Sequence, residues 1–319
     1  ETAGCKNSKT SASSSISSAI GSPRPSGRST SGWHGSSPHQ PKGADRRSSP
    51  SPTVLPIKRT PDERFQNLPA YPFAPHYVIL SGARMHYVDE GSGEVILCLH
   101  GEPSWSFLYR KMIPPLARER RVIAPDFFGF VKSDKFTERS EYSFQMHRDS
   151  LVAFMDHLGL TRITLVCQDW GGLIGLWVVG EMPERFARLV LMNTALGTGE
   201  PLGPGFMAWR DYMAKNPDLD VSALFKRAIV QEASRAPEIL AAYAAPFPDR
   251  AYKEGAHAFP LLVPITPDDP GALESRKAQA VLAGNVPDPT LDVGFEHISA
   301  CVDAFRGAGY PYPGPTSCP

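Results

Sequence analysis

The sequence predicts an α/β fold, in which a mostly parallel sheet is flanked by helices and a helical insertion precedes the last part of the chain. From residue 77 onward, short apolar runs rich in β-branched residues alternate with longer stretches of helical character. Strands that alternate with helices favour right-handed crossovers and therefore parallel pairing. At about residue 196 the strand pattern stops, and helical segments punctuated by proline replace it.

Six apolar runs are the expected strands, and three longer stretches between the later runs are the expected helices. The first two strands are close enough in sequence to form an antiparallel hairpin. The strands are expected at Tyr77–Leu80, Met85–Val88, Val95–Leu99, Val122–Ala124, Ile163–Cys167 and Leu189–Met192, and the helices at Trp105–Leu116, Phe144–Leu158 and Gly172–Gly180.

The composition divides the chain into four regions. Residues 1–60 are rich in Ser and Pro with few large apolar side chains. Such a segment cannot bury enough surface to offset its ordering entropy, so we expect a disordered extension, with an organellar transit peptide as the alternative. Residues 61–195 are the expected core, residues 196–258 a helical cap, and residues 259–319 an incomplete or divergent end of the core.

Charge and cysteine usage exclude several classes of protein. Lys+Arg and Asp+Glu are equal at 33 each, so no net charge favours nucleic acid or an anionic membrane. The longest apolar stretch, around Leu173–Val179, is too short to cross a bilayer. The five cysteines lack paired or metal-type spacing, and Cys98 and Cys167 lie in expected buried strands. We therefore expect a cytoplasmic protein without a metal or cofactor.

The end of the fifth expected strand is the most informative segment. It has the sequence Gln168-Asp169-Trp170-Gly171-Gly172, and an apolar helix follows at once. A sharp strand-to-helix turn lifts one side chain above the sheet, and hydrolases with this turn usually place Ser there. A carboxylate at this point can displace a leaving group from saturated carbon and form an alkyl ester without first losing a proton. The alternative is an ordinary helix N-cap, for which Asp is also preferred.

Five motifs together resemble one known family. They are HGEPSWSFLYRKMIP at 100–114, RVIAPDFFGF at 121–130, ITLVCQDWGG at 163–172, AYAAPFPD at 242–249 and FPLLVP at 259–264. Each motif alone has low specificity, but five in the expected order are specific. Over residues 60–282 the chain resembles the haloalkane dehalogenases, which have the α/β-hydrolase fold.

The resemblance implies that Asp169 attacks the halogen-bearing carbon of a small apolar haloalkane, and that water hydrolyses the ester to an alcohol. It implies an oxyanion hole made by the backbone N–H groups of Glu102 and Trp170. The halide ion is then bound by the indole N–H of Trp170 and of a cap tryptophan, for which we select Trp209. An indole N–H donates and cannot accept, which suits an anion in an apolar pocket. We expect a monomer without a nucleic-acid or membrane partner.

The C-terminal part departs from the family. Hydrolysis of the ester needs a His base and an acid that orients it, and the family places them after the seventh and eighth strands. Beyond Leu282 the sequence predicts no strand pair, and only Asp288 and His297 are candidates for the acid and the base. We therefore expect the last strands to be missing and at most one turnover, with the alkyl ester trapped on Asp169.

Two alternatives stay open. An epoxide hydrolase shares the Asp nucleophile and the cap but needs cap tyrosine hydroxyls, whereas Gln168 and Glu102 favour the dehalogenase. The chain could instead be a non-catalytic remnant or an unstable fragment, which would fail to fold alone. The remaining polar candidates are expected to be structural: His86, Asp126, Asp134, His147, Tyr212, Tyr243 and Tyr252.

Overall fold

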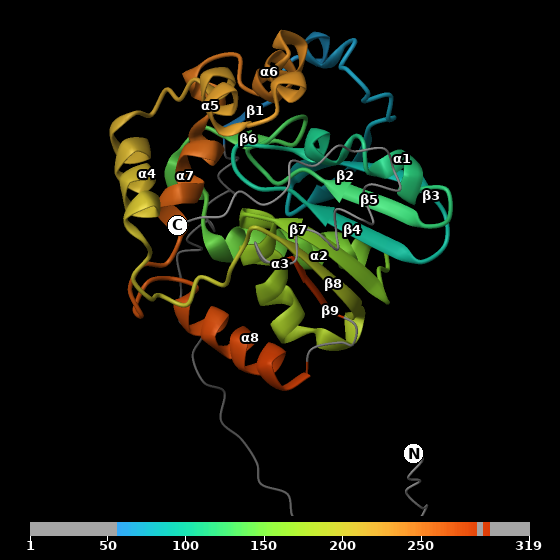
Figure 1. Cartoon of the computed structure of the whole chain (residues 1–319), viewed down its shortest axis with the longest axis vertical. Coiled ribbons are helices and arrows are strands. Elements are labelled where there is room, and N and C mark those ends of the chain that lie inside the picture. The colour runs from blue at the N-terminus through green and yellow to red at the C-terminus, as the bar shows by residue number, and fades with distance from the viewer. Residues whose placement is uncertain (1–55, 286–289, 294–319) are drawn as a thin grey trace, which may run out of the picture. The chain divides into compact units, whose positions relative to one another are not determined.

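A computed structural model describes residues 56–285 and 290–293. Its main sheet has seven strands in the order β2-β3-β5-β4-β7-β8-β9 (Figure 1). The first two pairings, β2 with β3 and β3 with β5, are antiparallel, and the other four are parallel. The strands are β2 (His76–Leu80), β3 (Ala83–Gly91), β4 (Val95–Leu99), β5 (Arg121–Pro125), β7 (Ile163–Gln168), β8 (Phe186–Met192) and β9 (Thr290–Val293). The predicted mostly parallel sheet is confirmed.

Strand β4 lies at the centre of the sheet and is buried along its whole length. Its alternate side chains point to opposite faces, as the pleat requires. Leu97 and Leu99 belong to one apolar cluster, whereas Ile96 and Cys98 belong to another. Both faces of the sheet are therefore covered, which explains why the strand has a continuous apolar sequence.

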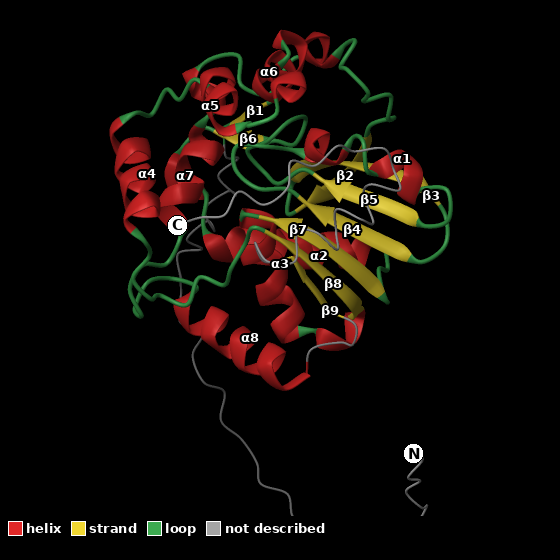
Figure 2. Cartoon of the chain, in the orientation of Figure 1, coloured by secondary structure: helices red, strands yellow, loops and turns green. Residues whose placement is uncertain are grey.

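Helices cover the sheet as Figure 2 shows. Helix α2 (Phe144–His157) begins at Ser143, whose hydroxyl accepts the N–H of Met146 at 3.0 Å. Helix α3 (Trp170–Glu181) packs between α2 and α8 (Ala272–Asn285). Short 3-10 helices occupy Asp62–Phe65, Ser106–Tyr109, Arg139–Glu141, Pro183–Arg185, Glu232–Arg235 and Arg250–Tyr252.

The helix expected over residues 105–116 is interrupted, and the prediction of one continuous helix is wrong. The structure has a 3-10 helix at Ser106–Tyr109 and a four-residue helix α1 (Ile113–Leu116). The reason is the pair Pro114-Pro115, because proline has no N–H to donate to an earlier carbonyl and is tolerated only in the first turn of a helix.

Four helices lie between β8 and α8 in the chain, where the sequence predicts a helical insertion. They are α4 (Pro204–Lys215), α5 (Val221–Ala228), α6 (Pro237–Ala244) and α7 (Glu254–Leu262). Helix α7 continues past the predicted boundary at residue 258. Residues of α4, α5 and α7 line a cavity together with the loops that follow β4, β7 and β8.

Both expected ends of the core need correction. The folded part begins before residue 60, because β1 (Ile57–Lys58) pairs with β6 (Lys135–Phe136) and Thr60 donates a hydrogen bond to the Pro246 carbonyl at 2.7 Å. At the other end, β9 pairs in parallel with β8, so one strand that was expected to be missing is present. In the part of the chain that the structure describes, no helix is long and apolar enough to span a membrane.

Candidate active site

Asp169 lies at the junction of β7 and α3 with φ of 51° and ψ of −124°. Left-handed φ values are unfavourable for a residue with a Cβ, so the surrounding structure must hold this turn. Two glycines allow the necessary approach. A Cβ on Gly171 would lie 2.1 Å from the Leu99 carbonyl oxygen, and one on Gly172 would lie 2.0 Å from the Thr194 hydroxyl oxygen. The predicted sharp strand-to-helix turn is present.

The Asp169 carboxylate does not cap helix α3, so the alternative of an ordinary N-cap is wrong. Its Oδ1 instead accepts the backbone N–H of Glu102 at 2.8 Å, and the adjacent backbone N–H of Trp170 also favours the charged form of the carboxyl. Burial raises the pKa of the Asp169 carboxyl, and these two N–H groups oppose that shift. The side chain is therefore an oriented carboxylate with two backbone donors directed at it.

Asp169 faces a cavity of about 770 Å³. All four residues that the sequence singles out for the site line it: Glu102, Asp169, Trp170 and Trp209. Most of the other lining side chains are apolar, which excludes much of the water that would otherwise solvate a bound group. They include Leu108, Leu173, Leu196, Leu202, Phe206, Leu224, Phe225, Pro260 and Val263.

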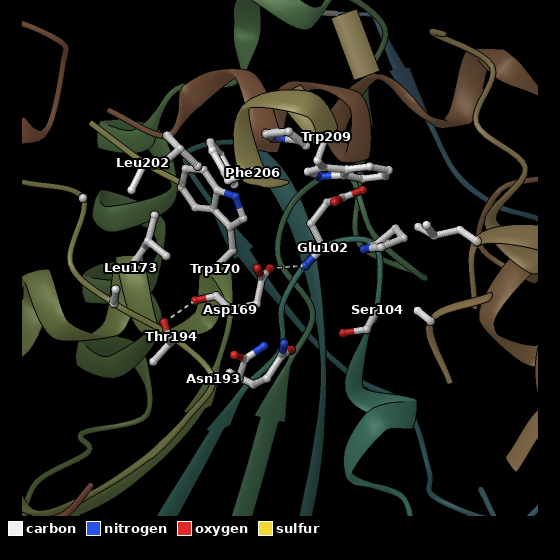
Figure 3. A pocket seen from close by; sticks show the side chains of 18 of the residues that line it. Glu102, Ser104, Asp169, Trp170, Leu173, Asn193, Thr194, Leu202, Phe206 and Trp209 are labelled. Carbon is white, nitrogen blue, oxygen red and sulfur yellow. Dashed lines mark hydrogen bonds between the residues drawn. The ribbon is translucent and has the colours of Figure 1, made fainter. Parts of the chain in front are cut away.

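The two tryptophan rings lie on the same side of the Asp169 carboxylate (Figure 3). Trp170 is 3% exposed, and its ring stacks on Phe259 with centroids 4.5 Å apart while Phe144 contacts it edge-on at 5.2 Å. Trp209 comes from α4 and stacks on Tyr212 at 5.9 Å. Neither indole N–H donates a hydrogen bond to any residue of the described part. Both donors are thus free to bind a ligand in the cavity.

The Glu102 side chain is a feature that the sequence interpretation missed. Its Oε1 is buried and has no hydrogen-bond partner among the described residues. Burial and the nearby Asp169 charge raise the pKa of the Glu102 carboxyl well above its usual range, so its surroundings favour the uncharged form. In Figure 3 the carboxyl points toward Trp209. No signal in the sequence distinguishes it from a solvated acid after a glycine.

The polar residues expected to be structural do not line the cavity. Asp126 accepts the N–H of Ser106 at 2.7 Å and contacts His86 Nδ1 at 2.6 Å, while Asp134 pairs with Arg59. These carboxylates therefore join segments that are distant in the sequence. His147 is buried, and burial lowers its pKa to about 3.

Neither a histidine nor a tyrosine of residues 56–285 lines the cavity. Tyr212, Tyr243 and Tyr252 are therefore not placed to protonate an epoxide, and the epoxide hydrolase alternative receives no support. The candidates Asp288 and His297 lie outside the described residues. Within the described part, no group of three or more His, Cys, Asp or Glu could hold a metal ion.

Known proteins resemble this chain along most of the described part. A family profile described as alpha/beta hydrolase fold matches residues 94–235. A haloalkane dehalogenase of Psychrobacter cryohalolentis is 51% identical over 231 residues, which are 70% of this chain and 76% of that protein. One of Mycolicibacterium paratuberculosis is 45% identical over 235 residues, 71% of this chain and 77% of that protein.

A solved structure shows the same likeness in three dimensions. The tetrameric haloalkane dehalogenase DpaA from Paraglaciecola agarilytica superposes with a TM-score of 0.72 at 39% sequence identity. The match covers 80% of this chain and 88% of DpaA. The haloalkane dehalogenase DatA from Agrobacterium tumefaciens gives a TM-score of 0.60 at 25% identity, over 69% of this chain and 78% of DatA.

Proposed function

The chain belongs to the haloalkane dehalogenases of the α/β-hydrolase fold, and from this premise we propose that it cleaves the carbon–halogen bond of small apolar haloalkanes with Asp169 as nucleophile. The observation that supports this proposal most strongly is the common orientation of one carboxylate and two free indole donors in one apolar cavity.

In the first step, an Asp169 carboxylate oxygen attacks the carbon that bears the halogen. The new C–O bond forms as the carbon–halogen bond breaks, and the halogen leaves with the bonding electrons as halide. The indole N–H groups of Trp170 and Trp209 donate hydrogen bonds to the developing anion in an apolar site, where such interactions are strong. The product of this step is an alkyl ester on Asp169.

In the second step, water attacks the ester carbonyl. The negative charge then develops on an oxygen that originates from the Asp169 carboxylate. The backbone N–H groups of Glu102 and Trp170 already contact this carboxylate, so they are oriented to stabilise the oxyanion without rearrangement. The bond from the carbonyl carbon to the alkoxy oxygen then breaks, so the alcohol leaves and the Asp169 carboxylate is restored. This step needs a base to activate water. Because no histidine of the described residues lines the cavity, we propose that the ester accumulates after one turnover.

Mass spectrometry of the intact protein tests the proposal. After incubation with a 1-bromoalkane, we expect a mass increase of one alkyl group and release of one bromide per chain. Asp169→Asn should show neither, whereas the matched control Asp149→Asn should behave as the unmodified protein, since Asp149 lies on the surface of α2. Absence of both ester and bromide from the unmodified protein would refute the proposal, and continuous bromide release would refute only the single turnover.

The monomeric state and the cytoplasmic location stay predictions. DpaA, which superposes on this chain, is tetrameric. Size-exclusion chromatography with light scattering distinguishes the two assemblies, since a tetramer of this 34.8 kDa chain has four times the mass of the monomer.

A further inference from the structure

The strained turn at Asp169 is held by the segment that follows β8. The Asp169 N–H donates to the Asn193 carbonyl at 3.3 Å. On the other side of the same residue, the Thr194 hydroxyl donates to the Asp169 carbonyl at 2.6 Å, a bond that is visible in Figure 3. Two consecutive residues of the neighbouring chain segment therefore fix both peptide groups of the nucleophile.

The Thr194 hydrogen bond is additional to those that helix α3 requires. The Asp169 carbonyl also accepts the N–H groups of Gly172 at 2.9 Å and Leu173 at 3.2 Å, as the first turn of α3 requires. These two bonds follow from the helix, whereas the Thr194 hydroxyl reaches the same oxygen from outside it. Gly172 makes this approach possible, because a Cβ there would overlap the Thr194 side chain.

We propose that Thr194 is a positioning residue for the nucleophile: its hydroxyl holds the Asp169 peptide so that the carboxylate stays directed at the halogen-bearing carbon. The inference rests on the proposed function. Displacement at carbon needs the oxygen in line with the leaving group, and a misplacement of about 1 Å can reduce the rate on the order of 100-fold. The Thr194 bond limits rotation of the Asp169 backbone and so keeps the Asp169 carboxylate in its orientation.

Two substitutions separate this role from the bulk of the side chain. Thr194→Val removes the hydroxyl and keeps the shape, and Thr194→Ser keeps the hydroxyl and removes the methyl group. Thr194→Ala serves as a second variant without hydroxyl in case valine prevents folding. Thr60→Val is the matched control, because Thr60 also donates to a carbonyl, that of Pro246 at 2.7 Å, but does not line the cavity.

The measurement is the bromide burst in single-turnover experiments with a 1-bromoalkane, together with the dissociation constant of bromide by calorimetry. For Thr194→Val we expect the saturating burst rate to fall about 10- to 100-fold. Thr194 also lines the cavity, so ligand binding must be measured separately. If Thr194 acts through Asp169 and not on the ligand, bromide affinity and the half-saturating substrate concentration should change less than about twofold. Thr194→Ser should restore most of the rate, and Thr60→Val should lower only the melting temperature.

Three results would overturn the inference. The first is an unchanged burst rate in both Thr194→Val and Thr194→Ala. The second is an equal loss in Thr194→Ser, which would mean that the methyl group matters. The third is a change confined to half-saturation, which would mean direct contact with substrate. Each leaves the proposed function intact, whereas absence of a burst from the unmodified protein overturns both.

Discussion

Replacement of Trp170 by Phe tests the proposed halide site with little change to the packing around it. The phenyl ring keeps the stack on Phe259 and the edge contact with Phe144 but removes the indole N–H. A hydrogen bond to a charged group contributes about 1.5–3 kcal/mol. At about 1.4 kcal/mol for each factor of ten, the dissociation constant of bromide should rise roughly 10- to 150-fold.

The chain provides a matched control for this substitution. Trp177 is 2% exposed, close to the 3% of Trp170, but its indole N–H donates to Glu181 at 2.8 Å and it does not line the cavity. Trp177→Phe therefore removes a similar ring and a similar donor outside the halide site. We expect Trp177→Phe to lower the free energy of unfolding and to leave bromide affinity unchanged.

Isothermal calorimetry gives the bromide dissociation constants, and denaturant unfolding gives the stability of each variant. Trp209→Phe should weaken bromide binding as Trp170→Phe does, but with a smaller loss of stability, because Trp209 is only partly buried. The reasoning fails if Trp170→Phe binds bromide within a factor of two of the unmodified protein. It also fails if Trp177→Phe weakens binding as much as Trp170→Phe.

Three further predictions concern the turn and the buried charges. Gly101→Ala should abolish the bromide burst and destabilise the fold by about 1–3 kcal/mol, because the new Cβ would lie 2.4 Å from Asp169 Cβ. The control Gly205→Ala should have neither effect, because its Cβ would meet no atom within 4 Å. The saturating alkylation rate should fall with decreasing pH through the raised pKa of Asp169, since only the carboxylate attacks; a rate that stays constant down to pH 4 contradicts this. Burial lowers the pKa of Lys135 to about 7. Between pH 7 and 9 the unfolded state therefore binds more protons than the folded state, and the free energy of unfolding should rise by about 1 kcal/mol per pH unit. Chemical denaturation of Lys135→Met should lack this rise.

The sequence predicted those features that depend on local patterns. Strand β4 begins and ends at the predicted residues, because a buried central strand has an uninterrupted apolar sequence with clear breaks at both ends. The turn at Asp169 was predictable for a similar reason, since its β-branched strand, paired glycines and apolar helix are contiguous. The local pattern failed at Pro114, because the apolar spacing predicted a continuous helix that proline interrupts.

The missed features of the site depend on contacts between distant residues. Thr194 donates to a carbonyl 25 residues earlier in the chain, and Glu102 contacts a carboxylate 67 residues later. No pattern in the sequence predicts the Thr194 hydroxyl contact or the burial of the Glu102 carboxyl. The pairing of β9 with β8 also joins distant residues, because helices α4 to α8 lie between the two strands in the chain.

This separation of β8 from β9 has a kinetic consequence during synthesis of the chain. Strand β8 emerges from the ribosome about 100 residues before the strand that pairs with its free edge, and at roughly 5–20 residues per second that delay lasts several seconds. During this interval the backbone groups of β8 are open to pairing with another nascent chain. Co-translational association and slow final closure are therefore expected to limit the yield of native protein more than the intrinsic speed of the early β-hairpin and helices.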